Sequence, residues 1–161
     1  MDATSNSEPA VTKRTTVERR SDREVVVTRS FDAPASLVFE AWSTPELFQR
    51  WWVPKSFGTH LHACEMDVRT GGTYRLNFGE GVDFFGRYIE VVPLLRIVWT
   101  NEEGGENGSV STVTFEEQDG RTLVALTELY PSTEALDAEG GAVDAMEETF
   151  GQLDELLITL R

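Results

Sequence analysis

Four charged residues have the types and spacing that could do chemistry. Glu65, Asp67 and Arg69 alternate along a segment predicted to be a strand, so their side chains share one face. Glu90 could join them from a neighbouring strand. If that face lies inside the protein, the four could orient a ligand head group or act as an acid or base. The alternative is a structural ion pair beside a turn at Gly71.

Three further side chains alternate on the opposite face of the same strand. His60, His62 and Cys64 carry the nitrogen and sulfur ligands that zinc accepts. On an extended strand the outer two lie about 13 Å apart, which is too far for both to reach one ion. Cys64 and His62 could form a nucleophile and base, but no third member of a triad is recognisable. The sequence therefore favours no metal site, no catalytic residue and no cofactor.

Large aromatic residues are placed as they would be around an internal pocket. Ligand sites are mostly apolar concavities, although such residues also form ordinary cores. Trp51 and Trp52 are neighbours, so on a short helix they point about 100° apart, and one is expected at the pocket mouth or surface. With Asp67, Arg69 and Glu90, the predicted ligand-binding residues are Phe39, Trp42, Trp51, Trp52, Tyr74, Phe85, Tyr88, Met146 and Phe150.

The composition describes one domain with an acidic surface. The chain has 161 residues, of which 40% are hydrophobic, as in ordinary globular domains. Its formal charge of -14 disfavours nucleic acid and membranes as partners. The sequence shows no membrane-spanning apolar run and no signal-peptide pattern. A single cysteine allows no internal disulfide, which fits a cytoplasmic location.

The elements that must position these residues follow from turn signals and periodicity. Residues 1–22 are polar and are expected to form a loose tail, with one domain over 23–161. β-Branched residues from Val25 to Thr28 predict a strand, and Pro34 and Pro45 begin two short helices. Further strands are expected near 59–69, 72–79, 83–92, 95–101, 109–118 and 121–129, followed by a polar connection over 131–141.

The end of the chain carries the pattern of one long helix. Its apolar residues recur at steps of three and four: Val143, Met146, Phe150, Leu153, Leu157 and Leu160. That stripe needs a partner, and the sheet is the only large surface available. These elements predict an α+β helix-grip fold, with a curved antiparallel sheet of about seven strands, two short helices and a long C-terminal helix. One helix cannot fill the hollow side of such a sheet, so an internal cavity is expected.

Six ordered blocks carry a family resemblance. They are RSFDAP at 29–34, VFEAW at 38–42, TPEL at 44–47, WWVP at 51–54, DVRTGG at 67–72 and GRYIEVVP at 86–93. Together they resemble the homologues of the heat-shock protein 90 ATPase activator, in the START-like (SRPBCC, polyketide-cyclase-like) superfamily. The resemblance covers roughly residues 24–160 and implies the helix-grip fold. Thr149-Phe150 stands where that family often carries Gly-Trp, and the extra N-terminal domain of the eukaryotic co-chaperones is not expected here.

Three functions are left open. The favoured one is binding of a small hydrophobic or aromatic ligand in the cavity, which the resemblance implies for many small family members. The second is a cyclase or hydrolase, which would need Asp67 or Glu90 to point into the cavity. The third and least favoured is a module that binds a chaperone and activates its ATPase in a stress response. Homodimer formation is left open.

Overall fold

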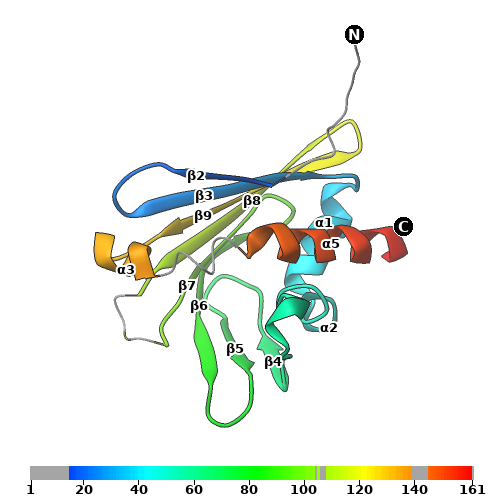
Figure 1. Ribbon diagram of the computed structural model, residues 1–161. Coiled ribbons are helices and arrows are strands. Elements are labelled where there is room, and N and C mark those ends of the chain that lie inside the picture. Colours follow the sequence, from blue (N-terminus) through cyan, green and yellow to red (C-terminus); the bar gives the residue numbers. More distant parts are fainter. Residues whose placement is uncertain (1–14, 104, 106–107, 139–144, 161) are drawn as a thin grey trace.

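An eight-stranded antiparallel sheet dominates the protein in a computed structural model that describes residues 15–103, 105, 108–138 and 145–160 (Figure 1). The strand order is β2-β3-β9-β8-β7-β6-β5-β4. The bounds are β2 (Thr16–Arg19), β3 (Glu24–Phe31), β4 (Ala63–Met66), β5 (Thr73–Asn77), β6 (Asp83–Val92), β7 (Arg96–Thr100), β8 (Val110–Gln118) and β9 (Arg121–Leu129). The predicted α+β class and antiparallel sheet are confirmed, with eight strands in place of about seven.

The helices begin where the sequence signals predict. Extended Pro34 precedes α1 (Ala35–Ser43), and Pro45 opens the short α2 (Pro45–Phe48), which a 3₁₀ turn, η2 (Lys55–Phe57), follows. The long helix α5 (Met146–Leu160) runs across the sheet in Figure 1 and contacts α1 and β3. Val143, the first residue of the predicted stripe, lies outside the described residues. A short helix, α3 (Thr133–Ala138), occupies the expected polar connection.

Strand β2 is a departure from the sequence-based expectation. It lies inside the 1–22 stretch expected to be a loose tail, and Thr16–Arg19 pairs in antiparallel register with residues 25–28 of β3. All four of its residues are exposed. Backbone pairing rather than side-chain burial orders this edge strand, so hydrophobicity does not reveal it. Residues 1–14 of the expected tail lie outside the described residues.

The turn between β8 and β9 shows why hairpins were readable from the sequence. Asp119 and Gly120 have φ of 56° and 79°. Positive φ at both central residues is the geometry of the tight turn that Asp-Gly favours. The turn sets the register Gln118↔Arg121, and every later pair of the two strands follows from it.

Arg29 is a buried charge that ties the long helix to the sheet. Only 5% of its side chain is exposed. Its guanidinium donates to Thr15 Oγ1 at 2.9 Å, to Glu147 at 3.4 Å and to Asp154. Because both carboxylates lie on α5 and Arg29 lies on β3, the cluster holds the helix against the sheet.

Candidate ligand-binding cavity

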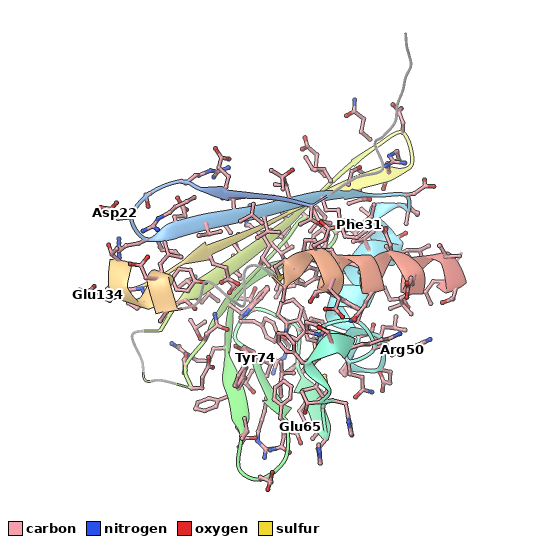
Figure 2. All side chains as sticks on the ribbon, viewed as in Figure 1. Asp22, Phe31, Arg50, Glu65, Tyr74 and Glu134 are labelled. Atoms are coloured by element: carbon pink, nitrogen blue, oxygen red, sulfur yellow. The ribbon has the colours of Figure 1, made fainter. Side chains whose placement is uncertain are left out.

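A cavity of about 1020 Å³ lies between the sheet, the α2 region and the first turns of α5. Its lining comes mainly from apolar side chains. Figure 2 shows one of them, Tyr74 of β5, in the interior below α5. Five of the predicted residues line it: Trp42, Trp52, Tyr74, Tyr88 and Met146. Lining residues that sequence reasoning missed include Phe48, Leu76, Phe84, Trp99, Leu126 and Tyr130.

The neighbouring tryptophans take different places, as their helical spacing predicts. Trp51 is fully buried, and its indole Nε1–H donates to the carbonyl oxygen of Ala41 at 3.0 Å. Trp52 is half-buried, stacks on Phe48 with ring centroids 4.9 Å apart, and lines the cavity. Trp51 is thus a core residue, while Trp52 presents its ring to the cavity.

Gln152 of α5 fixes the segment that carries Trp52. Its side-chain amide donates to the carbonyl oxygens of Trp51 at 2.9 Å and Val53 at 3.0 Å, and accepts from the backbone N–H of Lys55 at 2.9 Å. One buried side chain therefore satisfies three backbone groups of an irregular segment. The signal in the sequence is a glutamine between Phe150 and Leu153 of the apolar stripe.

A chain of polar side chains runs along one wall of the cavity. The Tyr74 hydroxyl has two acceptors for its one hydrogen, the carbonyl oxygen of Thr100 at 2.8 Å and Asn101 Oδ1 at 2.9 Å. Asn101 Nδ2 donates to Ser111 Oγ at 3.0 Å, and the Ser111 hydroxyl donates to Glu128. Burial first, then the nearby charge of Glu103, raises the pKa of Tyr74 well above its usual range, so the phenol stays protonated. The chain of donors ends on the carboxylate of Glu128, which lines the cavity.

Three predicted site residues belong to the core beside the cavity and do not line it. Phe150 is fully buried against Phe31, with ring centroids 5.5 Å apart. Phe39 packs on Phe115 at 5.5 Å, and Trp51 is held as described above. Their placement as pocket residues is wrong because Phe150 and Phe39 pack against aromatic residues of the sheet, and Trp51 against the helix aromatics, outside the cavity lining.

Asp67 and Arg69 lie outside the cavity, and their prediction as pocket residues is wrong. Strand β4 ends at Met66, so the two residues occupy the following turn rather than one strand face. Their side chains are 53% and 72% exposed and form an ion pair at 2.8 Å. A Cβ on Gly72 would lie 2.0 Å from the Asp67 carbonyl oxygen, so this tight turn requires glycine. The structural reading of this cluster is the correct one.

Glu90 and Phe85 also face away from the cavity. The register of β6 against β7 shifts between Tyr88 and Glu90, so one extra residue turns Glu90 to the outer face, away from the face of Tyr88. There Glu90 accepts from Arg96 at 2.8 Å, and this hydrogen bond lowers the pKa of its carboxyl group. Phe84 and Phe85 are similarly exposed, at 44% and 42%, but they alternate along β6 and only Phe84 lines the cavity. Both predictions are wrong. The bulge that reverses the orientation of Glu90 has no signal in the sequence, and two adjacent phenylalanines do not reveal which one points inward.

The second candidate cluster, on and before β4, contains a half-buried thiol. The rings of His60 and His62 stack at 5.1 Å, and Cys64 Sγ lies 3.5 Å from Met66 Sδ. Over the described ranges, no group of three or more His, Cys, Asp or Glu residues is arranged to hold a metal ion. Burial first, then the charges of Glu46 and Glu65, raises the pKa of the Cys64 thiol to about 11.

Cys64 should therefore alkylate slowly in the folded protein. At pH 8 a pKa of about 11 leaves a thiolate fraction about 100-fold below that of an exposed cysteine. Iodoacetamide labelling followed by mass spectrometry measures the rate. The same protein unfolded in urea is the control, and equal rates in the two states would contradict the assignment of a half-buried, unreactive thiol.

The sheet, the long helix across it and the cavity between them define a helix-grip protein of the START-like class. The chain belongs to the family described as Activator of Hsp90 ATPase homolog 1-like protein, whose family model matches residues 32–158. The resemblance found in the sequence blocks is thereby confirmed. No curated protein matches the chain.

Solved bacterial structures share this fold. A protein from Rhodobacter sphaeroides superposes with a TM-score of 0.80 at 24% identity, covering 91% of this chain and 99% of that chain. Protein Ms6760 from Mycobacterium smegmatis superposes with a TM-score of 0.75 at 23% identity, again covering 91% of this chain and 99% of that chain. A Staphylococcus epidermidis protein superposes with a TM-score of 0.71 at 26% identity, covering 91% of this chain and 95% of that chain. Within the described part of the chain, no helix is long and apolar enough to cross a membrane.

Proposed function

We propose that this protein binds a small apolar or aromatic molecule in the cavity between the sheet and α5. The observation that carries the proposal is the cavity itself, whose volume of about 1020 Å³ is at the upper end of typical ligand pockets. Rings of Trp42, Trp52 and Trp99 line it beside aliphatic side chains. Close packing elsewhere in a core makes so large an apolar hollow unusual unless a ligand uses it.

Trp42 contributes its ring to the cavity wall, while its indole N–H is buried out of contact with the cavity. It lines the cavity and is only 2% exposed, and its indole Nε1–H has no hydrogen-bond partner among the described residues. A buried donor without an acceptor costs about 1–3 kcal/mol.

The placement of the charged residues supports binding over catalysis through the predicted acids. Asp67 and Glu90 point away from the cavity, each paired with an arginine on the outside. The raised pKa of Cys64 also disfavours a nucleophilic thiol. Activation of a chaperone, a cytoplasmic location and homodimer formation stay predictions, since fold and family name alone do not carry function.

A fluorescence titration tests the proposed binding. N-Phenylnaphthylamine is a neutral, apolar probe that emits strongly when it leaves water. We expect saturable binding of one probe per chain, with probe emission rising as tryptophan emission falls, because three tryptophans line the cavity. Bound ligand should also raise the unfolding temperature, since it binds the native state alone. An unsaturable signal with no thermal shift, repeated across a broad set of apolar compounds, would remove the proposal.

A further inference from the structure

All charged side chains in the described lining of the cavity are acidic. Glu80, Glu103 and Glu128 line the cavity, and the described lining contains no lysine, arginine or histidine. Glu80 and Glu103 are exposed at the rim, while Glu128 is half-buried on β9. Inside a low-dielectric hollow, a carboxylate acts on a ligand's charge more strongly than it does in water.

The polar side chains of this wall use their hydrogens on one another, so the groups left to contact a ligand are hydrogen-bond acceptors. Both amide hydrogens of Asn101 have acceptors available, in Ser109 and in Ser111, and the hydroxyl hydrogen of Ser111 is directed to Glu128. An ionised carboxylate can accept about four hydrogen bonds, so Glu128 can take a ligand donor as well as its protein partners. The raised pKa of Tyr74, to which Glu103 and Glu128 both contribute, is consistent with negative potential at this wall.

Aromatic rings complete a surface suited to a cation. Tyr74, Tyr88, Trp99 and Tyr130 line the same cavity, and the faces of such rings attract an ammonium group. Trp99 lies opposite Ser111 in the sheet register, and Ser111 lies opposite Glu128. The register therefore brings ring, hydroxyl and carboxylate together on adjacent strands.

From these observations we infer that the ligand is an apolar or aromatic amine whose protonated nitrogen contacts Glu128, and that apolar carboxylates are rejected. This inference rests on the proposed function. The cavity is the independent reason to expect a ligand at all. Rejection follows because an anion would leave water to face carboxylates, with no cation in the described lining to compensate.

Three ligands with one ring system test the inference: naphthylmethylamine, naphthylmethanol and naphthoate. At neutral pH they are a cation, a neutral molecule and an anion. Calorimetric titration should show the amine binding about tenfold or more tightly than the alcohol, and naphthoate binding most weakly. Glu128→Gln keeps the size of the side chain and should cut the preference for the amine over the alcohol by about tenfold, while the alcohol keeps its affinity.

A matched variant separates local from overall charge. Glu116→Gln, at an exposed position of β8 outside the cavity lining, removes the same formal charge and should leave the preference unchanged. If all three ligands bind equally, if naphthoate binds best, or if the two variants behave alike, the inference is overturned while the proposed function stands. If none of the three binds the unaltered protein, the proposed function fails, and this inference fails with it.

Discussion

Replacing Arg29 by methionine is expected to lower the free energy of unfolding by about 3 kcal/mol. The arginine is 5% exposed and contacts two carboxylates of α5, so its removal withdraws the cation that balances them inside the protein. Losing one partner of a buried pair typically costs about 3–5 kcal/mol, and the partial exposure of Asp154 and Glu147 favours the lower end. Urea unfolding followed by circular dichroism measures the change.

Arg19→Met supplies the control for this prediction. Arg19 lies on the adjacent strand β2 and pairs with Asp137, but both side chains are about half exposed or more, at 48% and 62%. An exposed pair contributes about 0–1 kcal/mol, so this variant should unfold almost as the unaltered protein does. Equal losses in the two variants would show that Arg29 does not anchor α5.

Thr149→Trp should lower the affinity for N-phenylnaphthylamine by about tenfold or more. Thr149 is 2% exposed on α5 and lines the cavity, so an indole at this position would occupy space that the probe needs. A hollow of about 1020 Å³ has room for the larger side chain without rebuilding the core. Probe titration gives the affinity, and urea unfolding checks that the variant is folded.

Ile158→Trp is the matched variant on the same helix. Ile158 is 63% exposed and lies outside the cavity lining, so this change should leave probe affinity as it was. A folded Thr149→Trp protein that binds the probe as tightly as Ile158→Trp does would place the probe elsewhere on the protein.

The sequence predicted the sheet well where turns are specified by a few residues. Strand β6 was placed at 83–92 and β9 at 121–129, as the structure has them, because glycine turns precede both strands and a proline follows soon after each. Strand β2 was missed because its order comes from backbone pairing alone. The helix α3 (Thr133–Ala138) was missed because it has only six residues, with Leu136 as its one buried residue, so no helical periodicity shows in the sequence.

The candidate site was predicted only in part, and the reason is strand parity. Tyr74 and Tyr88 were predicted correctly because they are large aromatic residues on strands. Phe84 and Phe85 are adjacent and of the same type, so the sequence does not reveal which of them points into the cavity. The bulge beside Tyr88 reverses the face of Glu90, and no local residue signals it. Glu128 was missed because its role depends on a partner, Ser111, that the sheet register supplies.

The indole N–H signals of the four tryptophans offer the most direct test of ligand binding in the cavity. Nuclear magnetic resonance of the isotope-labelled protein resolves them one by one. On addition of N-phenylnaphthylamine, the signals of Trp42, Trp52 and Trp99 should move, since these rings line the cavity. Trp51, whose N–H is held by Ala41, should move least. Four unmoved indoles, with changes confined to the exposed face around Phe85, would contradict binding inside the protein.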